Sequence, residues 1–240
     1  MSQPLVLSLF PGIGLLDRAF EEEGFCVVRG PDLLWGGDVR RFHPPSRKFD
    51  GVIGGPPCQV HSGMADLNPL AGRKHGDQIP EFERCVAEAR PSWFVMENVP
   101  RAPVARVTGY LTKAVLVQDV AVGGDTTRER RFTFGSHRFP ECFYVEELAL
   151  HRPDPELTVL AGHGPAAGQR VRGIEGRTWQ DCARLQGLPA EWIATIAENA
   201  ILTVHGYKKV IGNGVPLPMG RAIAKAVKRS MYPELVEAAS

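Results

Sequence analysis

The chain has 240 residues, of which 43% are hydrophobic and 23% are charged, and its formal net charge is +1. This composition excludes a globally disordered protein, and the length is sufficient to bury the core of one substantial α/β domain. Because a net charge of +1 produces only a weak overall field, any contact with nucleic acid must come from a local basic surface.

The cysteines and the hydropathy of the chain indicate in which cellular compartment the protein is expected. The five cysteines form no C-x-x-C pair and are odd in number, which excludes both a disulfide framework and a zinc cluster and favours a reducing environment. Residues 4–16 are apolar but lack a basic leader and are interrupted by Pro11, Gly12 and Gly14, so they indicate a strand and a turn. No apolar run reaches the roughly 18 residues of a membrane span. We therefore expect a soluble cytoplasmic protein with no membrane and no metal partner.

The first half of the chain alternates short apolar runs with helical or loop segments. Residues 5–10 predict a strand, a glycine-containing turn follows, and 15–23 predict a helix. Further strands are expected at 26–28, 51–53, 92–96, 114–122 and 131–134. This order is typical of a Rossmann-like α/β fold, a mostly parallel sheet flanked by helices.

The second half differs in character. Residues 136–176 are irregular and contain several prolines and glycines, whereas helices are expected at 178–186, 189–199 and 217–231. We divide the chain into residues 1–135, the main domain, residues 136–176, the irregular region, and residues 177–240, a small lobe whose last helix returns to the main domain. The polar, Gly-rich segment 63–79 is expected to be a long loop of the kind that often serves as a lid.

The first candidate site lies at the turn Phe10-Pro11-Gly12-Ile13-Gly14. Glycines at the end of a strand allow the backbone to approach a bound cofactor, although an ordinary strand-to-helix turn has the same pattern. A dinucleotide fingerprint fits less well, because its third glycine would fall on Asp17. Asp32 and Asp38 follow the second predicted strand, where a carboxylate can accept hydrogen bonds from ribose hydroxyls or an adenine amino group. Each acid alone is more often a solvated turn residue.

Three further motifs follow predicted strands. Cys58 stands after two rigid prolines at the end of a strand, where α/β sheets place ligands, although most cysteines are simply small buried residues. Glu97, in Met96-Glu97-Asn98-Val99-Pro100, would reach the same sheet edge or serve as an ordinary helix-entry acid. Thr127-Arg128-Glu129-Arg130-Arg131 suggests a carbonyl or phosphate site, or a plain basic surface patch.

Taken in order, these motifs resemble the DNA cytosine-C5 methyltransferase family. The cofactor loop is similar to residues 10–15, the nucleophile motif Pro-Cys-Gln matches residues 57–59, and Glu-Asn-Val matches residues 97–99. Arg128 and Arg130 match the two arginines of Gln-x-Arg-x-Arg. The family's late motifs resemble residues 184–189 and 212–216. The matches are collinear over residues 5–230, nearly the whole chain.

The resemblance implies a reaction and a set of site residues. Cys58 would add to C6 of a cytosine flipped out of double-stranded DNA, and Glu97 and Arg130 would stabilise the activated ring. Arg128 would position these two residues or hold a phosphate. The donor would be S-adenosylmethionine, which leaves as S-adenosylhomocysteine. The implied donor-binding residues are Phe10, Gly12, Ile13, Gly14, Leu15, Asp32, Asp38, Val39, Pro56, Asn213 and Val215. The implied DNA-binding residues are Gln59, Ser62, Arg73, Lys74 and Arg184.

The chain departs from the family pattern in several places. Leu15, His61, Thr126, Leu188 and Val210 stand where the family usually has a glycine, an aromatic residue, a glutamine, a phenylalanine and a glutamine. Only about forty residues, 136–176, stand where the family usually inserts a target-recognition domain. The resemblance therefore implies a compact, phage-like member from a prokaryotic or phage-infected cell, with a protein partner as a candidate source of target recognition. A non-catalytic or partner-dependent DNA-binding homologue and an RNA cytosine methyltransferase remain as alternatives.

Overall fold

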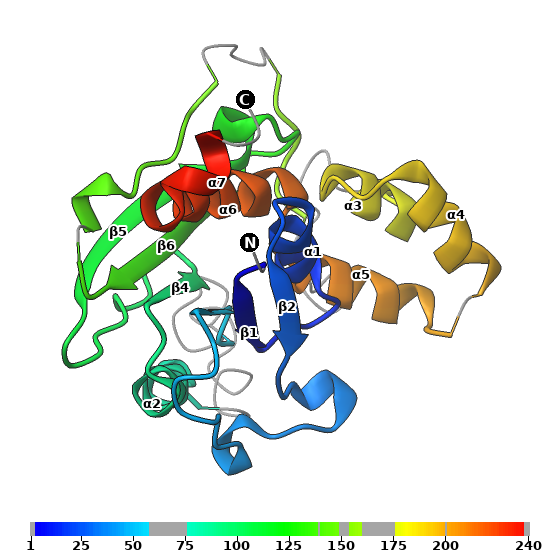
Figure 1. Ribbon diagram of the computed structural model, residues 1–240. Helices are drawn as coiled ribbons and strands as arrows, with labels where there is room; N and C mark the ends of the chain where they lie inside the picture. Colours follow the sequence, from blue (N-terminus) through cyan, green and yellow to red (C-terminus); the bar gives the residue numbers. More distant parts are fainter. Residues whose placement is uncertain are drawn as a thin grey trace.

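The structure of the protein is a computed structural model that describes residues 3–57, 76–138, 140–148, 154–159, 176–199 and 201–237. Its centre is a six-stranded sheet with the order β2-β1-β3-β4-β6-β5 (Figure 1). The strands are β1 (Leu5–Leu9), β2 (Cys26–Arg29), β3 (Gly51–Gly54), β4 (Trp93–Asn98), β5 (Leu111–Gln118) and β6 (Glu129–Ser136). Neighbours from β2 to β4 are parallel, and β6 is antiparallel to both β4 and β5. The predicted Rossmann-like, mostly parallel α/β fold is thus confirmed.

Alternating side chains of the strands divide the core into two apolar layers. In β4, Trp93 and Val95 join the cluster that includes Phe20 of α1 (Leu15–Glu22) and Ile223 of α6 (Leu217–Met231). Phe94 and Met96 of the same strand instead join the cluster formed with α2 (Ile79–Ala89). Since successive residues of a strand point to opposite faces, this arrangement places α1 and α6 on one face of the sheet and α2 on the other.

A small lobe stands beside the sheet, drawn from yellow to orange in Figure 1. It consists of α3 (Trp179–Leu185), α4 (Ala190–Glu198) and α5 (Val204–Asn213). The stacked rings of Trp179 and Tyr207 lie in its apolar cluster, which also includes Leu15, the first residue of α1. The lobe is therefore packed against the start of α1. A short helix, α7 (Pro233–Glu237), follows α6.

Most predicted elements have close counterparts, and α6 has the predicted bounds. The prediction of one strand over 114–122 is wrong, because β5 ends at Gln118 and residues 119–122 form the 3-10 helix η4 (Asp119–Val122). The chain turns there because the buried Asp119 carboxylate accepts hydrogen bonds from the backbone N–H and hydroxyl of Thr126. Helices α2 and α5 were not predicted. The remaining 3-10 helices are η1 (Leu33–Trp35), η2 (Val39–Arg41) and η5 (Pro140–Cys142).

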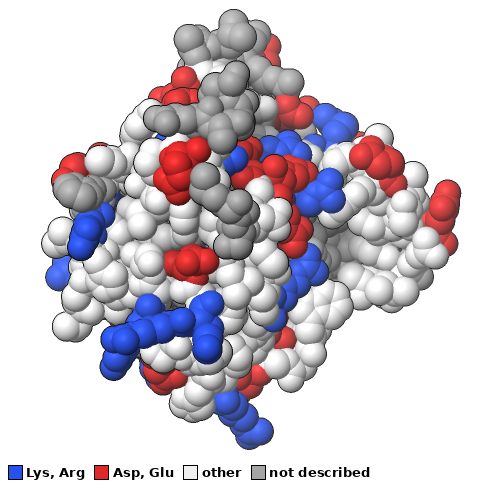
Figure 2. Space-filling view, in the orientation of Figure 1, with Lys and Arg blue, Asp and Glu red and all other residues white. Residues whose placement is uncertain are grey.

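The visible surface carries both signs of charge. Figure 2 shows basic and acidic side chains intermixed over much of this face, with a dense group of Lys and Arg at its lower left. Within the part of the chain that the structure describes, no helix is long and apolar enough to cross a membrane. Nor do the described residues include a group of three or more His, Cys, Asp or Glu side chains able to hold a metal ion.

Candidate active site

A cavity of about 430 Å³ lies at the carboxyl ends of β1, β2 and β3. The sheet order reverses direction between β1 and β3, and open α/β sheets bind their ligands at this kind of switch point. The volume is within the range of small-molecule sites. The wall is formed by Phe10, Pro31, Asp32, Leu33, Gly37, Asp38, Val39, Arg40, Pro57, Gly76 and Gln78.

The turn after β1 is fixed by residues that follow β2. The Gly12 N–H donates to the Asp32 carboxylate at 2.9 Å, and the Gly12 carbonyl accepts from the Trp35 indole N–H at 2.7 Å. Phe10, Gly12 and Gly14 have φ values of 55°, 57° and 80°, so the chain passes three times through the left-handed region. Such a conformation disfavours residues with a Cβ, which explains glycine at position 14 and makes Phe10 a strained wall residue.

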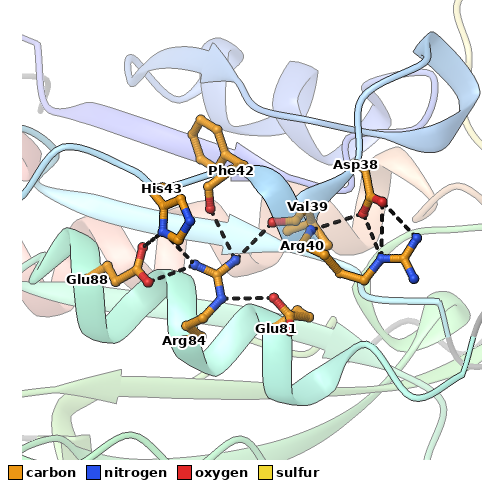
Figure 3. Close-up of polar contacts among 8 residues, drawn as sticks. All are labelled: Asp38, Val39, Arg40, Phe42, His43, Glu81, Arg84 and Glu88. Carbon is orange, nitrogen blue, oxygen red and sulfur yellow. Dashed lines mark hydrogen bonds and ion pairs between the residues drawn. The ribbon is translucent and has the colours of Figure 1, made fainter.

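The two acids of the cavity wall have different surroundings. Asp32 caps η1 through the Leu34 N–H and holds Gly12, so each of its oxygens already accepts one backbone hydrogen bond. Asp38 instead accepts from the Arg40 guanidinium through both oxygens, and it also caps η2 (Figure 3). The hydrogen bonds from Arg40 lower the pKa of Asp38 to about 2. Both carboxylates keep further lone pairs that can accept hydrogen bonds from ligand hydroxyl or amino groups.

The turn after β3 lies against the end of β4. The Asn98 side chain donates to the Pro56 carbonyl at 3.3 Å and accepts from the Val99 N–H at 2.8 Å. A Cβ on Gly55 would stand 3.0 Å from Glu97 Oε2, so glycine allows this backbone to approach the carboxylate closely. The residues that immediately precede Cys58 in the chain are thereby placed beside Glu97.

Glu97 and Arg130 form an ion pair at the same edge of the sheet. Arg130 Nε lies 2.9 Å from Glu97 Oε1, and only 17% and 11% of the two side chains are exposed. Arg130 also donates from Nη1 to the Glu129 carbonyl at 2.7 Å. The pair is possible because β4 and β6 are antiparallel neighbours, so the end of one strand meets the beginning of the other. Glu97 Oε2 faces Gly55, next to the turn.

Arg128 is almost fully buried and connects distant segments of the chain. Its Nη1 donates to the Val159 carbonyl at 3.0 Å, and its Nη2 donates to the Gly214 carbonyl at 3.1 Å. The Gln186 side-chain amide donates to the same Gly214 carbonyl at 3.0 Å. Arg128, the residue before β6, therefore connects the beginning of this strand to the segment 154–159 and to the turn between α5 and α6, a role that the motif alone did not indicate.

The remaining predicted residues that the structure describes do not line the cavity. Leu15 and Ile13 pack against the small lobe, and Val215 is buried in the core between the sheet and α6. Asn213, the last residue of α5, is exposed. Arg184 is 59% exposed and pairs weakly with Asp125, at 3.8 Å. Four predicted donor-site residues, Phe10, Asp32, Asp38 and Val39, thus lie together in the wall.

Several predicted residues fall outside the part of the chain that is described. They are Cys58, Gln59, Ser62, Arg73 and Lys74. Conversely, the wall contains Leu33, Arg40 and Gln78, which the sequence analysis did not single out. The position of Leu33 directly after Asp32 was a usable signal. Gln78 falls in the segment 63–79, which was expected to be a long loop, but its place in the wall depends on the fold, which brings the beginning of α2 to the cavity.

The arrangement has two adjoining parts with complementary chemistry. The cavity offers the aromatic ring of Phe10 and the carboxylates of Asp32 and Asp38, which suit the hydroxyl and amino groups of a nucleoside. The neighbouring pair of Glu97 and Arg130 offers a carboxyl group and a guanidinium, which can bind the edge of a small heterocycle with a ring nitrogen and a carbonyl oxygen. Pro57 belongs to the cavity wall and precedes Cys58, so the turn after β3 connects the two parts.

Comparison with known proteins gives consistent similarities. The sequence model of C-5 cytosine-specific DNA methylases matches residues 36–121. The Type II methyltransferase M.HindV of Haemophilus influenzae is 31% identical over 185 residues, covering 64% of this chain and 60% of that protein. The Type II methyltransferase M.NgoPII of Neisseria gonorrhoeae is 30% identical over 112 residues, covering 39% of this chain and 33% of that protein. The chain spans about a third of the length of the first curated relatives it matches.

Solved structures share the fold over nearly the whole chain. The Entamoeba histolytica methyltransferase EhMeth superposes with a TM-score of 0.66, covering 96% of this chain and 99% of that one at 12% identity. The S. pombe Dnmt2 methyltransferase superposes with a TM-score of 0.65, covering 96% of this chain and 100% of that one at 11% identity. At 12% and 11% sequence identity, the similarity to these two structures shows a shared fold and no more.

Proposed function

We propose that this chain, which belongs to the DNA cytosine-C5 methyltransferase family, transfers a methyl group from S-adenosylmethionine to C5 of cytosine in double-stranded DNA. The observation that carries the proposal is the pairing of Glu97 with Arg130 beside the turn that leads into Cys58. Such a pair matches one edge of a cytosine, and the cavity next to it suits a nucleoside-containing donor.

The donor site is assigned to the cavity at the ends of β1, β2 and β3. Phe10 supplies an aromatic surface, and the Asp32 and Asp38 carboxylates are available to ribose hydroxyls and the adenine amino group. S-adenosylmethionine supplies an electrophilic methyl group when bound. The turn that follows Phe10 is fixed by the hydrogen bonds of Gly12 with Asp32 and Trp35, and these hold the aromatic residue of the wall in place.

The cytosine is activated in the other part of the site, by Cys58 and the pair of Glu97 and Arg130. The Cys58 thiolate adds to C6 of cytosine, forming an S–C bond and moving an electron pair toward C5, N3 and O2. Glu97 forms a hydrogen bond between its Oε2 and N3 of the ring, and the two groups share the proton of that bond, while Arg130 donates a hydrogen bond to O2. The methyl group of a bound donor would then pass to C5, with S-adenosylhomocysteine as the leaving group. The C5 proton would pass to a base, and the Cys58 thiolate would leave as the C6–S bond breaks.

The reaction requires the cytosine to leave the DNA stack, because the thiolate and the methyl group approach opposite faces of the ring. Flipping costs a few kcal/mol, which phosphate and pocket contacts must offset. We assign these contacts to Gln59, Ser62, Arg73, Lys74 and Arg184, as the family resemblance implies. Target recognition is assigned to the region 136–176, with a protein partner as a further source.

The test of the proposal is covalent trapping. DNA that contains 5-fluorocytosine should form a stable adduct in the presence of the donor, because fluorine at C5 prevents the proton loss that precedes elimination. Peptide mapping should place the adduct on Cys58, and Cys58→Ser should abolish it while Cys26→Ser, which alters an exposed cysteine of β2, should not. Burial raises the pKa of Cys85 to about 11, so that thiol is a poor nucleophile and serves as an internal reference.

Three outcomes would contradict the proposal. An adduct on another cysteine would remove Cys58 from the reaction. Methyl incorporation into RNA but not into duplex DNA would identify an RNA cytosine methyltransferase. DNA binding without an adduct or methyl transfer would indicate a non-catalytic homologue. Duplex DNA, tRNA and free cytidine assayed in parallel separate these cases.

A further inference from the structure

Arg84 of α2 does not line the cavity, and all three nitrogens of its guanidinium make hydrogen bonds (Figure 3). Its Nη2 donates to the Val39 carbonyl at 2.9 Å and to the Phe42 carbonyl at 3.1 Å. The side chain is 27% exposed, so these bonds are partly shielded from water. All three nitrogens of the guanidinium are in use, because Nε and Nη1 bind carboxylates.

The carboxylates that hold Arg84 come from its own helix. Glu81 accepts from Nε at 2.9 Å and Glu88 accepts from Nη1 at 2.8 Å, one turn before and one turn after Arg84. Glu88 Oε2 in addition lies 3.0 Å from Nδ1 of His43, the residue that follows Phe42. The guanidinium is therefore fixed in orientation before it reaches the two carbonyls, and its planar fork is suited to such multiple contacts.

The segment that Arg84 holds forms one wall of the cavity. Asp38, Val39 and Arg40 line the cavity, and Val39 and Phe42 are the residues whose carbonyls bind Arg84. Within η2, the Arg41 N–H donates to the Asp38 carbonyl and the Phe42 N–H donates to the Val39 carbonyl. Arg84 thus binds the same turn of backbone that presents Asp38.

Helix α2 also reaches the cavity at its beginning. Gln78, which precedes α2, belongs to the cavity wall, and Phe82 packs against Gly54 at the end of β3. The helix is anchored in the apolar layer by buried residues, including Phe82 and Val86. Helix α2 is therefore well anchored, and Arg84 can hold residues 38–42 in a defined position from it.

We propose that Arg84 is a positioning residue that holds residues 38–42 in place for donor binding through its bonds to the Val39 and Phe42 carbonyls. The identity of the ligand as S-adenosylmethionine rests on the function proposed above, whereas the positioning of residues 38–42 rests on the contacts of Arg84. A lysine at this position would keep the charge, but a single ammonium cannot reproduce the fork that binds two carboxylates and two carbonyls.

The test compares Arg84→Met and Arg84→Lys with a matched control, Arg221→Met. Arg221 is an arginine of α6 that pairs with Glu22 of α1 and does not line the cavity. Both Arg84 variants should bind S-adenosylhomocysteine about tenfold more weakly in calorimetry, since the bonds that hold the wall are lost. KM for the donor should rise by about the same factor while kcat stays within about twofold. Arg221→Met should behave as the wild type.

Hydrogen exchange without any ligand tests the positioning by itself. The amide hydrogens of Arg41 and Phe42 should exchange about tenfold faster in the Arg84 variants, and the buried strands should exchange as in the wild type. If the wild type fails to bind S-adenosylhomocysteine while this local effect is present, the proposed donor is wrong and the positioning role stands. Unchanged exchange at residues 41 and 42 would overturn the inference. Faster exchange throughout the core would also overturn it, because Arg84 would then be a general stability residue.

Discussion

Arg130 Nε lies 2.9 Å from Glu97 Oε1, which joins the end of β4 to the beginning of its antiparallel neighbour β6. Both side chains are largely buried, and a buried charge that loses its partner is costly. The same pairing leaves Glu97 Oε2 directed to Gly55 and the turn before Cys58. One contact therefore orders the edge of the sheet and orients the carboxyl group that the proposed reaction uses.

Arg130→Met should lower kcat for methyl transfer by about a hundredfold or more, because a donor to the developing charge on O2 is removed. Glu97→Gln should have a comparable effect, since the amide cannot share a proton with N3. Binding of S-adenosylhomocysteine should change less than about twofold in both variants, because neither residue lines the donor cavity. Single-turnover kinetics with duplex DNA and calorimetry measure the two quantities. Variants that lose donor binding but keep the rate of methyl transfer would contradict the assignment of Glu97 and Arg130 to the cytosine.

Asp38 should act as a charged acceptor over the whole neutral and mildly acidic range. The hydrogen bonds from Arg40 lower its pKa to about 2, so the carboxylate stays ionised well below pH 5. Asp38→Asn should therefore weaken S-adenosylhomocysteine binding by the same factor at every pH between about 5 and 8. Calorimetry of both proteins across this range gives the ratio of their affinities. A ratio that approaches one on the acid side would show that Asp38 is protonated there.

Asp17 should make the protein less stable as the pH rises. Burial raises its pKa above the ordinary value of 3.8, although Ser8 and Arg29 both donate to the carboxylate. The folded state therefore binds the proton more tightly than the unfolded chain, and the free energy of unfolding falls from about pH 4 upward, through the folded pKa. Asp17→Asn lacks this titration.

The measurement for Asp17 is the difference in unfolding free energy between wild type and Asp17→Asn, from denaturant titrations between about pH 4 and 7. As the pH rises, the unfolding free energy of the wild type should fall relative to that of Asp17→Asn. A difference that moves in favour of the wild type would mean that the ion pair with Arg29 outweighs burial.

Arg128→Met should reduce the free energy of unfolding by about 2–3 kcal/mol, because the Val159 and Gly214 carbonyls lose hydrogen bonds from a charged donor. Urea denaturation measures this loss, with Arg221→Met as an exposed control. If activity disappears while stability is unchanged, Arg128 instead positions the reacting groups, as the family resemblance implies.

The sequence patterns identified the elements that depend on local order. The bounds of α6 and the approximate positions of the strands followed from apolar spacing, which reflects which face of an element is buried. Asp32 and Asp38 could be recognised because residues after parallel strands collect at one edge of the sheet. Helix α2 was not predicted, so Arg84 was not singled out, and Gln78 was expected only as part of the long loop 63–79. The strand expected over 114–122 was too long, since the turn at Asp119 depends on Thr126, seven residues away.

The sequence by itself determined the order of the motifs, the alternation of the strands and the residue types available for chemistry, because these are properties of neighbouring residues. Tertiary structure alone decided which of them meet. It paired Glu97 with Arg130, placed Asn98 on the Pro56 carbonyl, and directed Arg128 to Val159 and Gly214. These contacts join residues up to 86 positions apart, so they depend on sheet order and helix packing, which local patterns do not encode.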